Sequence, residues 1–459
     1  MRSWPATNRA LRRKHRLTHC RAAGRLESYP VRTVTPWQLT PLITRIQWCL
    51  GQKAVIKVRL KGYAMINKFD SLFAGHVDMD NVGYAGTAVN DRGFDNEHLV
   101  TAYDKARSIA QLMDRAGYDT FWMAEHHFQH EGYECIPNIM MLALHLAHVT
   151  DRLKYGCGFN ITPMWHPLRL AEDFAMADVL TGGRVVFGVG RGYHTREVET
   201  FGSPLLDQTG NRDLFEEQVD VIFKAFHEES FSHKGQHYTI PAEVPYRGYG
   251  LKELTVVPRP INRPVECWQP VQSATPRGLD FMAKHDIHGV IGGGVAEGGA
   301  TRRVVEAFTD ARNRAGRATE IGEALSFGFQ FYIADSQQEA MAAAGKYYEE
   351  NLKMFGPLRL IRSLSDEQIE IMSDPAQAPH ADLPRIEAAV ESGGFLAGPP
   401  EQIIEKLKAV EGWYPGLDRI MVSHPIGTPE AVIVEQLQWF SEDVMPAFKD
   451  SAVVVASDD

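Results

Sequence analysis

Short apolar runs alternate with amphipathic stretches along the chain from Met65 onward. Eight of the apolar runs are rich in β-branched and aromatic residues and stop at small or polar residues, a pattern that is typical of strands. These candidate strands are residues 68–74, 119–125, 154–161, 184–190, 265–272, 287–292, 325–334 and 418–424.

The stretches between the candidate strands have the spacing of helices. In residues 96–117, apolar side chains recur every three or four positions, and a glycine at the end supplies a stop signal. The recurring residues are Leu99, Ala102, Ala106, Ile109 and Met113, and the stop is Gly117. Strand and helix in eight repeats predict an α/β fold, a (β/α)8 TIM barrel with long inserted loops, and a doubly wound sheet is the alternative.

Two connecting segments are longer than ordinary loops. Residues 228–262 carry four prolines and three tyrosines, and residues 352–395 precede the last candidate strand. Long insertions in a barrel usually form lids or substrate walls. We therefore expect one barrel domain over residues 65–450 and no second domain.

Residues 1–64 differ in composition from the rest of the chain. They hold fourteen Lys and Arg against one acid, Glu27, whereas the remainder has 34 basic and 57 acidic residues. The basic leader has three interpretations: a disordered over-long translation start before Met65, a targeting segment, or a nucleic-acid-binding arm. The acidic body has no basic stripe, which argues against nucleic acid as its partner.

The composition is that of a globular protein, with 44% hydrophobic and 23% charged residues. The longest apolar runs, such as residues 139–149, are too short to cross a bilayer. The five cysteines show neither CxxC pairs nor zinc spacing. We expect a cytoplasmic protein in a reducing compartment, without a membrane partner.

A histidine cluster follows the second candidate strand. The strand ends in Glu125, His126 and His127, and His130 comes shortly after. Adjacent strand residues point in opposite directions, so at most one of the pair faces the barrel mouth, where the chemistry of a TIM barrel lies. We take His126 as the catalytic acid/base candidate, place His127 against the surrounding structure and His130 in the loop, and assign no metal ligand. A metal site and a satisfied, partly buried histidine are the alternatives.

The fourth candidate strand ends in a glycine-rich segment. Gly188, Gly190 and Gly192 surround Arg191, which bares backbone N–H groups beside a guanidinium and favours a mononucleotide phosphate. No acid follows at the place that a dinucleotide fingerprint requires.

Two further strand ends have ambiguous patterns. The end of the third, GCGFNITPMWHP, fits either the close approach of a flat ligand or a plain turn. The end of the fifth, with Ser273 and Thr275, fits either an anion site at a helix start or a simple helix cap.

Three segments together carry a family resemblance: GYDTFWMAEHHF, then NITPMWHPLRLAED, then GGRVVFGVGRGYHTREVETFG. In order and spacing they resemble the bacterial luciferase family of flavin-dependent monooxygenases, and most of all its catalytic, alpha-type subunit. The resemblance extends over residues 66–448 and includes the closing helix, AVIVEQLQWFSEDVMPAF.

This resemblance implies a TIM barrel that takes reduced FMN from a separate NAD(P)H-dependent flavin reductase. The flavin would react with O2 to a C4a-peroxyflavin and oxygenate a small, apolar organic substrate, and the chain would form a homodimer. His126 matches the family's catalytic histidine, which would protect or protonate the flavin peroxide. The positions matching the family's cofactor contacts are Gly158, Phe159, Asn160, Arg191, Arg212, Gln272 and Ser273. The Gly158–Phe159 bond lies where the family has an often cis peptide.

Three departures limit what the resemblance implies. Gly190 stands where luciferases have an active-site cysteine, so light emission is not implied, and Gln272 replaces an acidic residue. The insertion at 352–395 also exceeds the luciferase pattern, and substrate identity depends mainly on such loops. A deazaflavin-dependent dehydrogenase or reductase of the same fold, a noncatalytic flavin-binding subunit, and a metal-dependent hydrolase are the alternatives.

Overall fold

The structure is a computed structural model that describes residues 66–292, 294, 299–361 and 363–449. The prediction about the basic leader, residues 1–64, lies outside these residues. Within them, no helix is long and apolar enough to span a membrane.

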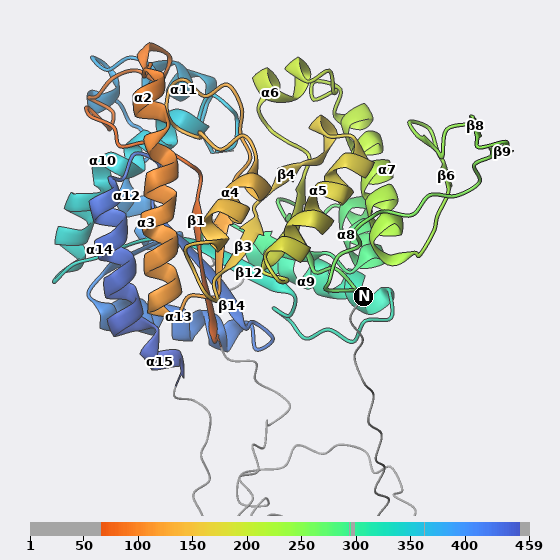
Figure 1. The fold of residues 1–459 in the computed structure, drawn as a ribbon. Helices are drawn as coiled ribbons and strands as arrows, with labels where there is room; N and C mark the ends of the chain where they lie inside the picture. The colour runs from red at the N-terminus through yellow and green to blue at the C-terminus, as the bar shows by residue number, and fades with distance from the viewer. Residues whose placement is uncertain (1–65, 293, 295–298, 362, 450–459) are drawn as a thin grey trace, which may run out of the picture. The chain divides into compact units, whose positions relative to one another are not determined.

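Eight parallel strands form a closed barrel in chain order, with β14 pairing back onto β1 (Figure 1). This ring confirms the predicted (β/α)8 barrel, and a doubly wound sheet is excluded because that sheet would be open. The strands are β1 (Lys68–Phe73), β2 (Thr120–Met123), β3 (Lys154–Cys157), β5 (Val185–Gly190), β10 (Cys267–Pro270), β11 (His288–Ile291), β12 (Leu325–Ile333) and β14 (Arg419–Ser423).

Two glycines let neighbouring strands of the ring pack closely. A Cβ atom on Gly156 would lie 2.3 Å from the indole ring of Trp122, and one on Gly188 would lie 1.9 Å from the carbonyl oxygen of Cys157. No side chain fits at either position. Glycine therefore allows β3 to pack against Trp122 of β2, and β5 to pack against the backbone of β3. This close approach lies directly below the rim that carries the candidate site.

The strands differ from the sequence prediction in two places. The third candidate strand is interrupted at the Gly158–Phe159 bond, which is cis as expected, and continues as a short strand, β4 (Asn160–Ile161), beside β5. A strand that the sequence analysis missed, β13 (Phe395–Gly398), pairs with β12 outside the ring. Its four residues are too few to show a strand period within a long insertion.

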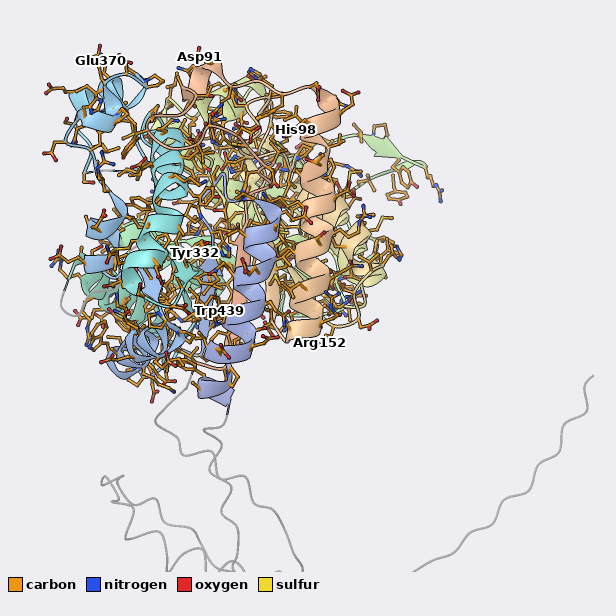
Figure 2. The ribbon with its side chains drawn as sticks, turned by 90° about the vertical axis from the view of Figure 1, so that its left-hand side faces the viewer. Asp91, His98, Arg152, Tyr332, Glu370 and Trp439 are labelled. Atoms are coloured by element: carbon orange, nitrogen blue, oxygen red, sulfur yellow. The ribbon has the colours of Figure 1, made fainter. Side chains whose placement is uncertain are left out.

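The outer layer consists of helices that follow the barrel strands. The principal ones are α3 (Thr101–Ala116), α4 (Ile139–Ala147), α5 (Pro167–Leu180), α7 (Gln208–His227), α8 (Pro276–His285), α9 (Ala300–Arg314), α10 (Gln337–Phe355), α13 (Pro400–Trp413) and α14 (Glu430–Trp439). Helices α3 and α14 lie side by side on one outer face, with Trp439 at the end of α14 (Figure 2). The closing helix of the sequence analysis continues from α14 through a π turn into α15 (Pro446–Lys449).

The predicted helix over residues 96–117 is broken at Val100 into α2 (Asn96–Leu99) and α3. The side chain of Asp95 accepts the His98 amide at 2.8 Å and begins α2. Gly117, at a φ of +91°, ends α3 as predicted, because this left-handed conformation favours glycine.

Both long insertions contain short elements of their own. Residues 228–262 form two small hairpins, β6 (His233–Lys234) with β7 (Thr239–Ile240) and β8 (Pro245–Tyr246) with β9 (Tyr249–Gly250). Residues 352–395 contain α11 (Asp366–Met372) and α12 (Ile386–Glu391), and the short helix α6 (Thr195–Thr200) follows β5. Helices α2, α6 and α11 gather at one end of the barrel, at the top of Figure 1.

A buried acid on α10 joins this helix to the loops after β1 and β2. Glu350 has no exposed surface and accepts Arg92 Nε at 2.9 Å, Lys353 Nζ at 2.9 Å and Tyr133 Oη at 2.6 Å. Because these donors come from three segments, one carboxylate holds several parts of the rim together.

A buried ion pair joins the first and last strands of the ring. Arg419 on β14 donates to Asp70 on β1 at 2.7 Å and contacts Asp119 at 2.9 Å, while Trp122 Nε1 donates to Asp70 at 2.9 Å. Asp70 is fully buried and Arg419 is 5% exposed. A buried charge is tolerated only when it is paired and hydrogen-bonded, and both conditions are met here.

We predict that Arg419→Met lowers the free energy of unfolding by about 3 to 5 kcal/mol, because it leaves Asp70 buried without its main counter-charge. Urea unfolding followed by circular dichroism measures the change. The matched control is Lys68→Met. It removes the solvent-exposed ion pair between Lys68, the first residue of β1, and Asp418, the residue before β14. The control loss should stay below about 1 kcal/mol, and equal losses in the two variants would contradict this account.

Candidate functional site

His126 lies at the rim of the barrel, three residues after the end of β2. Its backbone amide donates to the carbonyl of Ile136 at 2.9 Å, which folds the loop between them over the strand end. The imidazole is only 4% exposed. The predicted catalytic residue is therefore a buried group at the face where TIM barrels place their chemistry.

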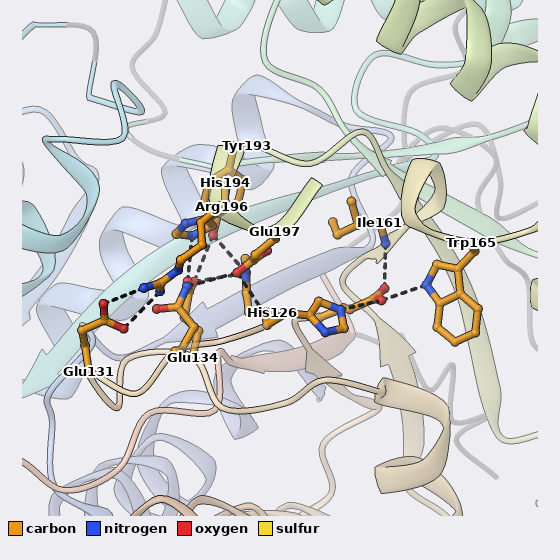
Figure 3. Close-up of polar contacts among 12 residues, drawn as sticks. His126, Glu131, Glu134, Ile161, Trp165, Tyr193, His194, Arg196 and Glu197 are labelled. Carbon is orange, nitrogen blue, oxygen red and sulfur yellow. Dashed lines mark hydrogen bonds and ion pairs between the residues drawn. The ribbon is translucent and has the colours of Figure 1, made fainter. Parts of the chain in front are cut away.

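Both ring nitrogens of His126 have polar partners (Figure 3). Nδ1 lies 3.3 Å from each carboxylate oxygen of Glu197, and Nε2 lies 3.0 Å from Tyr193 Oη and 3.2 Å from Glu134 Oε1. Glu134 comes from the loop after β2, while Tyr193 and Glu197 come from the segment after β5. The imidazole thus connects two strand ends.

The surrounding carboxylates control the charge of this cluster. Burial alone would lower the pKa of His126, but the carboxylates of Glu134, Glu197 and Glu125 outweigh burial and raise it. Burial alone would raise the pKa of Glu197, but its bonds with His126 and the His127 amide lower it to about 2. An imidazole that changes charge above its usual range suits proton transfer near neutral pH.

The other members of the histidine cluster have structural positions. His127 Nε2 lies 3.2 Å from Glu125 Oε1, and the same carboxylate accepts the Ile161 amide at 2.7 Å and Trp165 Nε1 at 2.8 Å. Glu125 is 1% exposed, and its bond to the Ile161 amide joins β4 to the end of β2. The His130 side chain is 66% exposed in the loop. The predicted placements of His127 and His130 are confirmed, and the catalytic role of His126 stays a prediction.

Atoms that could ligate a metal meet here in a combination that the sequence does not reveal. Nitrogen and oxygen atoms of His126, His194 and Glu197 lie within 4.8 Å of one another. Protein donors already satisfy the carboxylates, since Glu197 accepts the His127 amide at 3.0 Å and Gln129 Nε2 at 3.1 Å. We therefore interpret the cluster as an acid/base group, and the assignment of no metal ligand stays a prediction.

A cavity of about 330 Å³ lies beside the end of β5 and is lined by two of the predicted phosphate residues, Arg191 and Arg212. Asn211, which is fully buried, accepts Arg191 Nη1 at 3.1 Å and donates to the Arg191 carbonyl at 3.2 Å. This reciprocal pair fixes the guanidinium at the cavity wall. The remaining lining residues are Thr275, which the sequence analysis placed at a possible anion site, and Gln208, Thr209 and Arg277, which it missed.

The cavity is strongly cationic. Burial lowers the pKa of Arg191, and so do the nearby guanidinium groups of Arg212 and Arg277. Arg277 is partly neutralised by Glu216 and Asp213, each at 2.6 Å, whereas Arg212 lies 3.7 Å from Glu216. Like charges held this close are relieved by an anion, and guanidinium groups bind phosphate well.

The other predicted cofactor residues divide into two groups. Asn160 Nδ2 donates to the Gly188 carbonyl at 2.9 Å. This bond holds residues 158–160 against β5, the strand that Arg191 follows. A Cβ atom on Gly190 would lie 3.2 Å from the Cβ atom of Phe159, so the glycine lets Phe159 pack close against the end of β5. Gln272 and Ser273 do not line the cavity: Gln272 is exposed, and Ser273 Oγ lies 3.4 Å from Thr275 Oγ1.

Comparison with known proteins agrees with this arrangement. The luciferase-like monooxygenase family matches residues 80–415, which is most of the described chain. The chain belongs to the luciferase-like monooxygenase family. This finding confirms the resemblance given by the three sequence segments and makes the protein an enzyme of the luciferase-like monooxygenase class.

Two relatives illustrate how far the similarity of this luciferase-like monooxygenase extends. The oxygenase component of flavin-dependent trigonelline monooxygenase from Acinetobacter baylyi is 25% identical over 79% of this chain and 94% of its own. The alkanal monooxygenase alpha chain of the Kryptophanaron alfredi symbiont is 30% identical, over 29% of this chain and 36% of its own.

Solved structures share the fold of this luciferase-like monooxygenase. A monooxygenase from Streptomyces bottropensis superposes with a TM-score of 0.61 at 20% identity, covering 83% of this chain and 99% of its own. The oxygenating constituent of 3,6-diketocamphane monooxygenase from Pseudomonas putida, in complex with FMN, gives 0.60 at 19% identity over 83% and 98%. The coenzyme F420-dependent tetrahydromethanopterin reductase from Methanopyrus kandleri gives 0.56 at 16% identity over 84% and 100%.

We predict that Arg191→Met weakens binding of inorganic phosphate by roughly tenfold, because one charge-assisted contact is lost. Titration calorimetry at constant ionic strength measures the affinity. Arg169→Met, which removes an exposed arginine on α5 paired with Glu172, should leave phosphate binding unchanged. Equal affinities for the wild type and Arg191→Met would rule out the cavity as the anion site.

Proposed function

We propose that the chain is the oxygenase component of a two-component, FMN-dependent monooxygenase that oxygenates a small, apolar organic substrate. The observation that carries the proposal is the presence of an arginine-lined cavity and a buried histidine between carboxylates on the same barrel rim. One feature suits a mononucleotide phosphate, and the other suits a proton transfer.

The residues present fit FMN. Arg191, Arg212 and Arg277 offer guanidinium groups to a phosphate dianion, and Thr209 and Thr275 add hydroxyl groups. Gly190 lets Phe159 pack close against the end of β5, and we expect the flat ring of the flavin to lie beside this segment. Reduced FMN, when bound, supplies the electrons with which O2 is activated.

The chain's own residues would then bind, exclude water and handle protons. His126 would hold a proton close to the reacting group, and its burial would limit exchange of that proton with bulk water. Of the aromatic side chains near the rim, Phe128 is 51% exposed and is a candidate cover for the site. Trp268 is no such candidate, because it packs at 5.7 Å against Trp122 inside the barrel.

The relatives support the finer points of the proposal. One is named as an oxygenase component, which supports a separate NAD(P)H-dependent flavin reductase as partner. One solved structure holds FMN, which supports FMN as the flavin. Homodimer formation and a cytoplasmic location stay predictions.

A second candidate function is a deazaflavin-dependent oxidoreductase. A reductase and a secondary alcohol dehydrogenase that depend on F420 share the fold, at TM-scores of 0.56 and 0.57. Such an enzyme transfers a hydride and needs no O2, so the two functions make opposite demands on oxygen.

We predict that the purified chain binds reduced FMN at least about tenfold more tightly than reduced riboflavin, because only FMN carries the phosphate. Anaerobic fluorescence titration compares the two flavins, and a parallel titration uses F420. Aldehydes, terpenes and alkanes are then screened for product formation coupled to O2 consumption by reduced FMN. Substrate turnover with F420 in the absence of O2 would overturn the proposal in favour of the second candidate.

We predict that His126→Ala lowers product formed per reduced FMN by at least about a hundredfold, the usual contribution of a positioned acid or base. The affinity for reduced FMN should change by less than about threefold, since the phosphate cavity is untouched. His145→Ala, an exposed histidine on α4 that lines neither cavity, is the control and should keep full product yield. An unchanged product yield in His126→Ala would remove His126 from the reaction.

A further inference from the structure

The hydrogen-bond geometry around His126 defines its protonation state. Each ring nitrogen faces an oxygen acceptor: Glu197 on the Nδ1 side, and Tyr193 with Glu134 on the Nε2 side. A neutral imidazole has a single N–H and can donate on one side only, whereas an imidazolium donates on both. All of these groups are buried or half-buried, so an unfilled donor position would be costly.

We propose that Glu134 and Glu197 hold His126 as an imidazolium, and that the cavity beside Glu134 is the route by which its proton is restored after each transfer. The catalytic meaning of this charge rests on the proposed function, but the charge itself does not. Glu134 and Glu197 are thus positioning residues that act through His126.

The two carboxylates are themselves kept as anions. Glu197 accepts the His127 amide and Gln129 Nε2 in addition to His126. Glu134 accepts Tyr193 Oη at 2.9 Å and lies 3.0 Å from His194 Nε2. A carboxylate with several donors favours its charged form.

The charged and titratable groups around the imidazole favour a positive charge on it. Three acids, Glu125, Glu134 and Glu197, act on it, and the guanidinium of Arg196, next to Glu197 in the chain, is paired with Glu131 at 2.7 Å. The titratable side chains that face His126 are Glu125, Glu134, Tyr193, His194 and Glu197. The raised pKa of His126 agrees with this geometry.

Tyr193 gives the cluster a direction. Its hydroxyl accepts from His126 Nε2 and donates to Glu134 Oε1. After His126 has given its Nε2 proton to the reacting group, the Glu134 carboxylate takes a proton from water in the cavity beside it. Glu134 passes this proton to Tyr193 Oη as Tyr193 passes its own proton to Nε2, so His126 is again an imidazolium and Glu134 is again an anion.

A second cavity of about 330 Å³ makes this last step feasible. It is bordered by α2 and the start of α3, and its walls include both His126 and Glu134 together with Gln129 and the exposed His130. Although part of the lining is apolar, Gln129, Glu134 and His130 offer hydrogen-bond partners to water, and the exposed side chain of His130 lies at the solvent side of the cavity. His126 therefore has a proton source separate from the arginine-lined cavity.

The charge of His126 can be measured on the full chain without flavin, by hydrogen–deuterium exchange at the imidazole C2 position read by mass spectrometry across pH. We expect His126 in the wild type to titrate above the usual histidine range. In Glu197→Gln and in Glu134→Gln, the ratio of imidazolium to imidazole at a given pH should fall at least about tenfold. Glu197→Asp keeps the charge and should restore the ratio, which guards against a variant that fails to fold.

The matched control is Glu131→Gln, which removes a carboxylate of the same loop that contacts Arg196 and not His126. It should leave the titration of His126 unchanged. An ordinary or lowered pKa of His126 in the wild type, or one insensitive to both carboxylates, overturns the inference. A stoichiometric divalent metal bound through His126, His194 and Glu197 also overturns it, and metal analysis of the same sample detects it.

A second readout follows the pH dependence of product yield. The imidazolium is lost as pH rises through the pKa of His126, so a raised pKa extends activity toward alkaline pH. The alkaline limb should move to lower pH in Glu197→Gln. If reduced FMN does not bind while the exchange result holds, the proposed function fails and the imidazolium stands; the reverse outcome removes only the inference.

Discussion

The barrel closes where its first strand meets its last, and the ion pair between Arg419 and Asp70 lies in this seam. The pair is buried and is completed by Asp119 and the indole N–H of Trp122, so its charges are compensated inside the ring. Closure is the condition for everything at the rim. Once eight parallel strands form a ring, their carboxyl ends meet in one circle, and residues far apart in the chain become neighbours.

The same physics has a different result at the rim. In the seam, one arginine, which is always charged, lies between two acids and makes a fixed structural pair. Around His126, two acids enclose a base that can release its proton, so the arrangement is able to change charge. Burial strengthens the electrostatic interactions in both places. Arginine makes the first cluster a permanent structural ion pair, whereas histidine makes the second a cluster that can exchange a proton.

The rim separates the proposed tasks in space. Arginines after β5 and on α7 and α8 form the anion cavity, whereas the histidine cluster opens on a second cavity beside α2. A cofactor phosphate bound at one place would orient a ring system toward the other without competing for the proton route. Glu350 and its donors Arg92 and Tyr133 tie α10 to this rim, and Tyr84 Oη donates to the Pro384 carbonyl of the insertion that follows α10. Such insertions are where members of one fold differ in the substrates they accept.

The sequence by itself predicted the eight strands of the barrel, because apolar runs are local patterns, and only closure of the ring excluded the doubly wound alternative. Strand ends and a glycine-rich turn also made His126 and Arg191 candidates, and the family resemblance added Arg212. It missed β13, the break at Val100, and the set of residues that meet around His126.

Glu134 and Arg277 lie in no pattern that predicts a role. His194 and Glu197 lie in the segment GGRVVFGVGRGYHTREVETFG, but nothing in that segment assigns them to His126. Only the closed ring brings these side chains together from separate strand ends. Distances across the barrel depend on register and on closure, which no single segment encodes, and this is why the partners of His126 emerged from the tertiary structure alone.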